Sequence, residues 1–372
     1  MDQQDRLNEH VETRPARPAR RDFLKGVGAA AGVAALVRDA AADPRPLSDA
    51  EKLERIASNT YPLRWLFKRR QPPQGQVSPG ADEMKRKYGE ITLLDFPQFT
   101  RDTFPGVRHM DVWSSLFGDV TDPSMYETQR IPREGRPPQT LHEFDPASPA
   151  GRTWLEAFAS RIAATGVRCH HVSNNAPRNI SVLDADARRA GIDTATKWLD
   201  ACAVIGARSM RVNTGGPRIV PSASAAQGYP RNDEIVPFLT NAIESFKEMA
   251  DHGGKVGVKV TIENHWGLSA DPTNVRIILD EVNHPWCEAS PDFCNWEHEY
   301  LLYHGLSALA PYTHTTVHAK YWDRWKSVDL RRCTRIMTRA GFRGIFALEY
   351  EDGPWDGVEG SRHLMQEVLA AL

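Results

Sequence analysis

Cysteine is scarce and unpatterned in this sequence. The chain has five cysteines in 372 residues, and no two of them form a CxxC pair. An odd number of scattered cysteines suggests neither a disulfide framework nor a thiolate zinc site. Most of the five are therefore expected to pack as small hydrophobic residues in the core.

An excess of charge of one sign and a long hydrophobic run are also lacking. The formal net charge is −2, so electrostatics gives no reason to expect nucleic acid as a partner. The apolar run at 27–37 is 11 residues long, against roughly 20 needed to cross a bilayer, so no stable membrane span is expected. With 41% hydrophobic and 25% charged residues, the chain has the composition of a globular protein with a large core.

The N-terminus has the pattern of a targeting segment. Residues 20–25 read RRDFLK, which closely resembles the twin-arginine export motif, and a weakly apolar stretch follows it. Residues 40–42 are three alanines, which suit signal cleavage. We predict a signal peptide over 1–42, recognised by the twin-arginine (Tat) translocase, and a periplasmic or otherwise exported mature protein.

Residues 43–90 are predicted to form an N-terminal extension. A helical pattern begins with Ser48 as its cap, and Pro62 breaks or kinks it. The stretch at 71–80 is rich in turn residues and reads as a connector. We expect this extension to pack on the main domain and not to fold separately.

From residue 91 onward, strand-like apolar runs alternate with amphipathic helical stretches. The eight strand-like runs lie at 91–96, 107–113, 167–173, 209–214, 258–263, 287–292, 314–319 and 345–350. This alternation favours an α/β fold, a closed (β/α)8 TIM barrel over 91–372, and not a doubly wound open sheet. A long Pro-rich insertion at 114–150 follows the second run, and such loops usually lie over the active site.

Four metal-type ligands lie just past the ends of consecutive strand-like runs: Glu263, Asp292, His318 and Glu349. The intervals between them, 29, 26 and 31 residues, match the roughly 30 residues of one strand-plus-helix unit of a barrel. All four side chains are therefore expected at the C-terminal face, where the active sites of this fold lie. Three carboxylates and one imidazole form a hard, oxygen-rich set that suits Mn²⁺, Mg²⁺ or Co²⁺ better than a structural Zn²⁺.

The motifs TIENH, SPDFCN, VHAKYWD and ALEYED, which carry these ligands in this order, resemble those of the sugar phosphate isomerase/epimerase family. This xylose isomerase-like barrel group includes the D-tagatose and D-psicose 3-epimerases, and the resemblance covers roughly 91–372. It implies one divalent metal, Mn²⁺ first with Mg²⁺, Co²⁺ or Fe²⁺ as others, bound by Glu263, Asp292, His318 and Glu349. It also implies that the two glutamates exchange a proton with the substrate carbon and that the protein is a homo-oligomer.

The chemistry of such a reaction matches these residue types. Epimerising or isomerising a ketose requires removal of a proton next to a carbonyl, which gives an enediolate. A divalent cation stabilises that anion as a Lewis acid. A carboxylate on each face of the sugar can then remove a proton from one side and return one to the other.

Further residues after the strand-like runs are predicted to contact the substrate. Where the related epimerases often have a histidine, this chain has Asn295, so the hydrogen bonds to the substrate should differ. His171 is preferred to its neighbour His170, because alternation turns only one of them into the barrel. Indole faces at a barrel mouth stack on sugar rings. The predicted substrate contacts are Trp113, His171, His265, Asn295, Lys320 and Arg324.

The substrate is predicted to be an unphosphorylated keto-sugar or glycoside, because no Gly-rich turn opens a helix for phosphate after the last two strands. The main prediction is a sugar epimerase or isomerase. An enediolate next to a leaving group can also eliminate it, so a lyase or dehydratase of a keto-sugar or 3-keto-glycoside is the first alternative. A non-catalytic sugar-binding barrel is the second. An endonuclease IV-like repair enzyme would need a three-metal cluster and a basic face, and neither is evident in the sequence.

Overall fold

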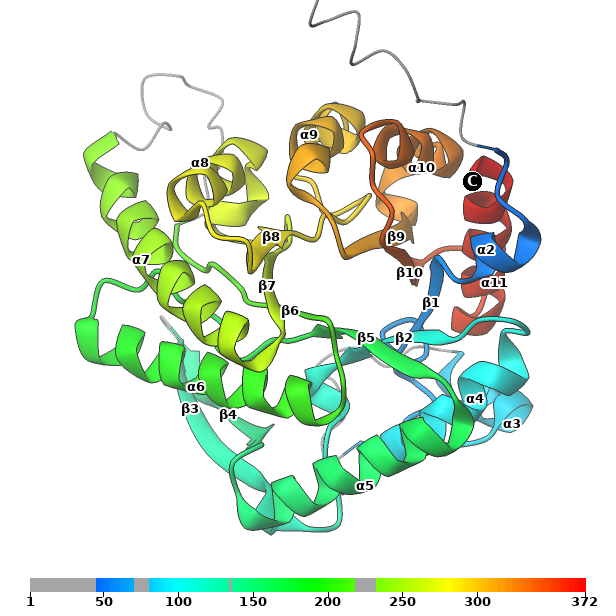
Figure 1. Cartoon of the computed structure of the whole chain (residues 1–372). Coiled ribbons are helices and arrows are strands. Elements are labelled where there is room, and N and C mark those ends of the chain that lie inside the picture. The colour runs from blue at the N-terminus through cyan, green and yellow to red at the C-terminus, as the bar shows by residue number, and fades with distance from the viewer. Residues whose placement is uncertain (1–44, 70–79, 134–135, 218–231) are drawn as a thin grey trace, which may run out of the picture. The chain divides into compact units, whose positions relative to one another are not determined.

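The computed structural model describes residues 45–69, 80–133, 136–217 and 232–372 (Figure 1). The predicted signal peptide lies outside the described residues. The fold below belongs to a unit that begins at Ser48 and ends at Leu372.

Eight strands form one curled parallel sheet, and the predicted TIM barrel is confirmed (Figure 1). Neighbours follow the order β8-β7-β6-β5-β2-β1-β10-β9, and every pair is parallel. The strands are β1 (Ile56–Asn59), β2 (His109–Trp113), β5 (Arg168–Ser173), β6 (Ser209–Arg211), β7 (Lys259–Ile262), β8 (Cys287–Ala289), β9 (Thr316–Trp322) and β10 (Ile345–Asp352).

The two end strands of this order, β8 and β9, meet just beyond the end of β8. A parallel bridge joins Asp292 to His318. The amide of Phe293 donates to the carbonyl of His318 at 3.1 Å, and the amide of His318 donates to the carbonyl of Pro291 at 3.0 Å. The barrel therefore closes at a seam that contains two of the predicted metal ligands.

Helices surround the sheet, as Figure 1 shows. Helices cover the outer face of the strands and the closed barrel encloses the inner face, which is why a strand such as β10 reads as a continuous buried run from Ile345 to Tyr350. Around the barrel lie α3 (Ala81–Tyr88), α4 (Phe96–Thr103), α5 (Pro149–Thr165), α6 (Ala185–Val204), α7 (Asn232–Val256), α8 (Pro272–Val282), α9 (Leu301–Leu309), α10 (Leu330–Arg339) and α11 (Gly357–Ala371). In the described part of the chain, no helix has both the length and the apolar character that a bilayer crossing requires.

Local signals fix the ends of several helices. In α5, the Ser148 side chain accepts from the amide of Gly151, Pro149 opens the first turn and Gly166 ends the helix in a left-handed conformation. In α8, Asp271 caps the start, and Asn283 ends the helix at a φ of 41°. The two N-terminal caps, Ser148 and Asp271, place the starts of these helices directly after loops at the C-terminal face of the barrel.

The strand predicted at 91–96 is wrong. In that run Leu93–Asp95 forms a 3₁₀ helix, and α4 follows it directly. Thr92 and Asp95 form a reciprocal cap that favours the helical turn. The apolar residues of this run pack from a helix onto the outside of the barrel, so their burial alone does not distinguish the two conformations.

The first barrel strand is β1, which lies within residues 43–90, the predicted extension. The helical pattern that begins at Ser48 extends only through α2 (Asp49–Leu53). All four residues of β1 are buried, and the strand pairs with β2 on one side and β10 on the other. The sequence pattern of this segment is helical, but its backbone pairs with a strand on each side. For so short a segment, this pairing determines the conformation.

The place of β1 in the core is open to a stability test. Ile56 is fully buried, so Ile56→Ala is expected to lower the free energy of unfolding by about 2–5 kcal/mol. The matched control is Leu183→Ala, at a side chain that is 55% exposed, and it should change that free energy by less than about 0.5 kcal/mol. Denaturant titration measures both. Equally small effects would show that residues 56–59 are an appendage and not a barrel strand.

The insertion at 114–150 contains an antiparallel hairpin of β3 (Tyr126–Arg133) and β4 (Arg136–Phe144). Its base packs on α5 and α6. Phe144 lies 5.5 Å from Trp154 and 5.8 Å from Trp198 between ring centroids, and Phe117 lies 5.1 Å from Trp198. An aromatic cluster thus fixes the insertion to the helices on one side of the barrel.

Candidate metal and substrate site

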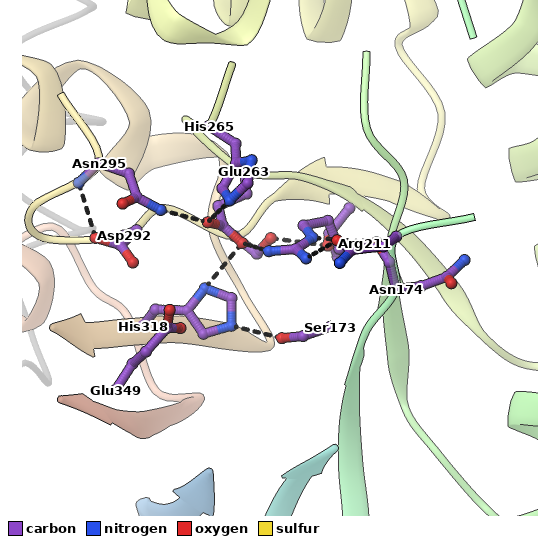
Figure 2. A network of polar contacts seen from close by, with 12 residues as sticks. Ser173, Asn174, Arg211, Glu263, His265, Asp292, Asn295, His318 and Glu349 are labelled. Carbon is purple, nitrogen blue, oxygen red and sulfur yellow. Dashed lines mark hydrogen bonds and ion pairs between the residues drawn. The ribbon is translucent and has the colours of Figure 1, made fainter. Parts of the chain in front are cut away.

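Three of the four predicted metal ligands converge at the C-terminal end of the strands. Glu263 follows β7, Asp292 follows β8, and His318 lies in β9 (Figure 2). Each offers one ligand atom, and the three atoms lie within 4.8 Å of one another. All three side chains are almost completely buried. Charged groups this deep are costly unless they bind something.

Asp292 is held with one oxygen fixed by two hydrogen bonds and the other oxygen without a hydrogen bond. Its Oδ1 accepts from the amides of Cys294 at 2.6 Å and Asn295 at 2.9 Å. Its Oδ2 is buried and has no hydrogen-bond partner among the described residues. Burial raises the pKa of Asp292 to about 7, with Glu349 and Glu263 adding to the rise and Lys320 opposing it. A buried carboxylate oxygen that accepts no hydrogen bond and lies beside two other ligands fits the coordination of a cation.

Glu349 lies beside this group but is bound elsewhere. Its Oε1 accepts from Lys320 Nζ at 3.0 Å, and its Oε2 accepts from Asn59 at 3.4 Å. Lys320 Nζ also lies 3.5 Å from Asp292 Oδ2 and 3.0 Å from Glu351 Oε2. The structure therefore connects Glu349 to the other three ligands through Lys320, and among the described residues it does not fall within their 4.8 Å group.

Arg211 holds Glu263 from the end of β6 (Figure 2). Its Nη1 donates to Glu263 Oε2 at 2.6 Å, and its other nitrogens donate to the Asn174 carbonyl and to the Asn175 side chain. Asn295 donates to the other oxygen, Glu263 Oε1, at 2.8 Å. Burial alone would raise the pKa of Glu263, but Arg211 overrides it and holds that pKa well below its ordinary value. The carboxylate is therefore ionised and fixed in orientation.

His318 lies between two carboxylates. Its Nδ1 is 3.3 Å from Glu263 Oε2, and its Nε2 is 3.0 Å from Asp111 Oδ2. Burial alone would lower the pKa of His318, but Glu263 and Asp111 raise it well above its ordinary value. Asp111 also accepts from Ser173 at 2.9 Å and from Asn59 at 3.1 Å. A carboxylate on the far nitrogen of a histidine is the usual arrangement that orients a metal-binding imidazole.

The charges of the site leave room for a divalent cation. Two fixed cations, Arg211 and Lys320, and the His318 imidazole, whose pKa is raised, face five carboxylates, which is more than they can neutralise. These buried or half-buried carboxylates are Asp111, Glu263, Asp292, Glu349 and Glu351. A divalent ion would offset most of the excess negative charge. The ligand types, the Asp292 oxygen that accepts no hydrogen bond and the charge balance therefore all fit such an ion.

A cavity opens next to these groups. Its volume is about 190 Å³, which is the space of about six water molecules and smaller than typical drug-sized pockets. Such a space suits a single sugar ring. Four of the predicted substrate contacts line it: Trp113, His265, Asn295 and Lys320. Arg211 and Asn295 both line the cavity and bind Glu263, so they connect the cavity to the ligand group.

The sequence model of the Xylose isomerase-like TIM barrel family matches residues 135–371 of this chain. The chain belongs to this family. No curated protein sequence matches it.

Solved structures share the fold of this xylose isomerase-like protein. A Xylose isomerase-like TIM barrel protein from Mycobacterium smegmatis, in complex with magnesium, is 15% identical, with 87% of this chain and 99% of that chain covered and a TM-score of 0.50. The 3-keto-D-glucoside 4-epimerase from E. coli is 11% identical, with 84% and 98% covered and a TM-score of 0.52. The D-allulose 3-epimerase from Methylomonas sp. is 12% identical, with 86% and 99% covered and a TM-score of 0.52. At such identities the likeness shows the fold.

Two predicted substrate contacts of this xylose isomerase-like protein lie away from the cavity. His171 faces the barrel interior, as alternation predicts, but it is fully buried with its Nδ1 2.8 Å from Ser209 Oγ. Burial lowers the pKa of His171 to about 3, so the ring is neutral. Arg324 is exposed and stacks on Trp322 and Trp325. Among the described residues, neither side chain lines the cavity, and neither does any residue of the 114–150 insertion.

Several residues of this site lie outside the predicted set. Asn59, Ser173 and Arg211 are the last residues of β1, β5 and β6, and Asp111 lies within β2. The sequence prediction considers only metal-type ligands at strand ends, which identifies Glu263 but excludes an arginine or a serine. A rule that included any charged or amide side chain at a strand end would find Arg211 and Asn59.

Asp111 is expected to act on the metal through His318. Asp111→Asn removes the negative charge that holds the imidazole, so affinity for Mn²⁺ should fall about 10- to 100-fold with the fold intact. The control is Ser173→Ala, which removes a hydroxyl that donates to Asp111 at 2.9 Å and lies 3.4 Å from His318 Nε2. It keeps both the carboxylate and the imidazole, so it should change that affinity much less. Calorimetric titration with Mn²⁺ measures both. Unchanged affinity in Asp111→Asn would show that the carboxylate does not position the ligand.

Proposed function

We propose that this protein is a divalent-metal-dependent sugar epimerase or isomerase that acts on an unphosphorylated keto-sugar or glycoside. The observation that carries the proposal is the buried group of Glu263, Asp292 and His318, whose ligand atoms lie within 4.8 Å of one another. The adjoining cavity has the volume of one sugar ring and is lined by Glu349. Two proteins that share the fold are a 3-keto-D-glucoside 4-epimerase and a D-allulose 3-epimerase, so this fold can support the chemistry.

In this proposal Glu263, Asp292 and His318 hold one divalent ion, with Glu349 as the fourth candidate ligand. Mn²⁺ is the first expectation, and Mg²⁺, Co²⁺ and Fe²⁺ are the others, because carboxylate and imidazole ligands suit all of them. When bound, such an ion supplies Lewis acidity that stabilises negative charge on the substrate oxygens. The Mycobacterium smegmatis protein of the same fold is a magnesium complex, which is consistent with a divalent ion here.

Glu349 and Glu263 are the proposed acid and base. The reaction needs a group that removes the proton next to the substrate carbonyl and a group that returns one. Glu349 lines the cavity directly. Glu263 is kept ionised by Arg211, so its base form is available, and it is connected to the cavity by Asn295. The two carboxylates are held by different partners, Glu263 by Arg211 and Asn295, and Glu349 by Lys320 and Asn59.

Lys320 is proposed to bind the substrate oxygen on which negative charge develops. Its Nζ lies 3.0 Å from both Glu349 Oε1 and Asn295 Oδ1, and the side chain lines the cavity. Burial alone would lower the pKa of Lys320, but Asp292, Glu349 and Glu351 raise it well above its ordinary value. The ammonium therefore stays charged inside the site. A fixed cation aimed at a developing oxyanion stabilises the transition state.

We also propose that the protein acts outside the cytoplasm. The support is the RRDFLK motif at residues 20–25 and the apolar stretch that follows. An exported enzyme would meet unphosphorylated sugars, which agrees with the proposed substrate. Replacing Arg20 and Arg21 by lysine and then measuring the protein in periplasmic and cytoplasmic fractions tests export separately from activity.

The test of the proposed activity is hydrogen exchange in D₂O. Protein loaded with Mn²⁺ is incubated with a panel of unphosphorylated keto-sugars and 3-keto-glycosides. We expect deuterium at the carbon next to the carbonyl and a product of unchanged composition, both dependent on the metal. Loss of water or of the aglycone would favour the lyase or dehydratase alternative. Sugar binding without exchange or product would favour a non-catalytic barrel.

A further inference from the structure

We propose that the substrate carries a carboxylate, and that Arg64 and Arg69 at the rim of the cavity bind it. The ligand class is thus a sugar acid. This inference rests on the proposed function for the sugar part of the ligand. It adds a binding site for the acid group that is separate from the metal ligands.

The two arginines follow β1 and line the same cavity as Glu349 and Trp113. Both are stacked on aromatic rings. The guanidinium carbon of Arg64 lies 4.3 Å from the ring centroid of Tyr61, and that of Arg69 lies 5.1 Å from the ring centroid of Trp113. A guanidinium that stacks on an aromatic ring still has its N–H groups free at the edge, where they can donate to a partner that lies in the guanidinium plane.

The cations deeper in the site already have partners. Arg211 is paired with Glu263, and Lys320 contacts Asp292, Glu349 and Glu351. By contrast, no carboxylate lies within 4.0 Å of either Arg64 or Arg69 in the part of the chain that the structure describes.

The hydrogen bonds of the two arginines also leave a donor open. Within the described residues, Arg64 donates one hydrogen bond, from Nη1 to the Tyr61 carbonyl at 2.9 Å. The nearby carboxylate of Glu351 is already bound by Lys320 and by the Tyr61 hydroxyl. Arg69 Nη1 is buried and has no hydrogen-bond partner among the described residues. Residues 70–79, which follow Arg69 directly, contain no Asp or Glu.

Placing two cations together in a half-buried rim is unfavourable without an anion. Burial, and then the charge of Arg64, lower the pKa of Arg69 to about 10. A buried charged donor without a partner costs free energy that an anionic ligand would recover. The structure therefore has a positively charged rim next to a negatively charged metal site. The rim suits the acid group of a ligand, and the metal site suits its sugar part.

The chemistry of the rim favours a carboxylate over a phosphate ester. A planar carboxylate matches the N–H fork of a guanidinium and can accept two parallel hydrogen bonds. The phosphate sites common in α/β folds use a helix N-terminus, and here the donors are side chains on the loop after β1. The cavity volume of about 190 Å³ leaves room for one ring with its substituents. The rings of Tyr61, Trp113 and Trp322, which line the cavity, provide stacking surface for that ring.

The experiment compares matched sugars that differ in one carboxylate. Binding of D-glucuronate against D-glucose, and of D-galacturonate against D-galactose, is measured by calorimetry on the full chain loaded with Mn²⁺. The wild type should bind at least one of the acids about tenfold or more tightly than its neutral partner. Arg69→Gln and Arg64→Gln should each reduce that preference. Arg332→Gln is the matched control, because Arg332 is also stacked on a ring, that of Tyr303 at 3.8 Å, and does not line the cavity.

Three results would overturn the inference. The first is equal binding of acid and neutral sugars, or no binding of either acid, by the wild type. The second is an acid preference that survives in both Arg69→Gln and Arg64→Gln. The third is Arg69-dependent binding of inorganic phosphate or sulfate that is tighter than that of the acids, since it would assign the rim to an oxoanion ester.

Binding and turnover separate this inference from the proposed function. Arg69-dependent binding of a sugar acid without hydrogen exchange in D₂O would support the acid-binding rim and contradict the proposed epimerase. Hydrogen exchange on neutral keto-sugars with no effect of Arg69→Gln would support the proposed epimerase and contradict the acid-binding rim.

Discussion

Glu349→Gln is expected to lower the rate of hydrogen exchange at the substrate carbon by about 10²- to 10⁴-fold, the contribution of a positioned general acid or base. Glutamine keeps the size of the side chain and one oxygen that can accept from Lys320, so the cavity should keep its shape. What it loses is the ability to take and return a proton. The rate of deuterium incorporation from D₂O, measured by NMR on the metal-loaded protein, gives the effect.

Glu351→Gln is the matched control for this result. Glu351 lines the same cavity, contacts the same Lys320 and loses the same charge on substitution. We expect its exchange rate to stay within about tenfold of the wild type. The substitution weakens only the contacts of this carboxylate with Lys320 and with Tyr61 at 2.9 Å, and a contact of that strength corresponds to about a tenfold change. If Glu349→Gln exchanged as fast as the wild type, Glu349 would not be the acid or base, and the proposed mechanism would fail at that residue.

His318→Gln is expected to release the metal. Wild-type protein should contain one divalent ion per chain, and the variant should bind Mn²⁺ more than about a hundredfold more weakly, since removing a direct ligand costs more than removing a group behind it. The described residues form two groups of candidate ligands, one of Glu263, Asp292 and His318 and the other of Asp111, His171 and His318. His318 belongs to both, so substitution of no other ligand in these groups removes a member of each. Elemental analysis gives the metal content, and calorimetry gives the affinity.

The control for the metal experiment is His265→Gln. His265 lines the cavity with its Nε2 4.0 Å from Glu263 Oε1, but it falls in neither group of candidate ligands within the described residues. It should keep the metal. Full metal content in His318→Gln would contradict the proposed site, and three zinc ions per chain would point to the endonuclease-like alternative.

The spacing of the ligands predicts much of the site because a parallel barrel repeats one structural unit. Glu263, Asp292 and His318 recur at nearly the period of one strand and helix, so their convergence follows from the fold once eight units are recognised. Glu349 is at the same phase, yet its carboxylate binds Lys320 and Asn59. Spacing predicts that a residue lies at the C-terminal face of the barrel, but not which neighbouring group its side chain binds.

The first strand shows the limit of pattern reading. Ile56–Asn59 has four residues and no alternation, and its strand conformation comes from the partners on both sides, which are far away in the sequence. Ile91–Phe96 is more apolar in its sequence but packs as a helical turn on the outside of the barrel. Arg211 is a similar case, because a cation is not an expected neighbour of a metal site until the excess of carboxylates around it is known.

The seam of the barrel has a consequence for how the protein would respond to its metal. The sheet is joined between β8 and β9 by the bridge from Asp292 to His318, and these residues are also two of the three converging ligands. An ion that binds both side chains would connect the first and last strands of the hydrogen-bonded order. Metal occupancy and closure of the barrel would then be linked equilibria, with a bound ion favouring the closed form by mass action. Scarcity of the ion would reduce the stability of the fold as well as the activity of the site.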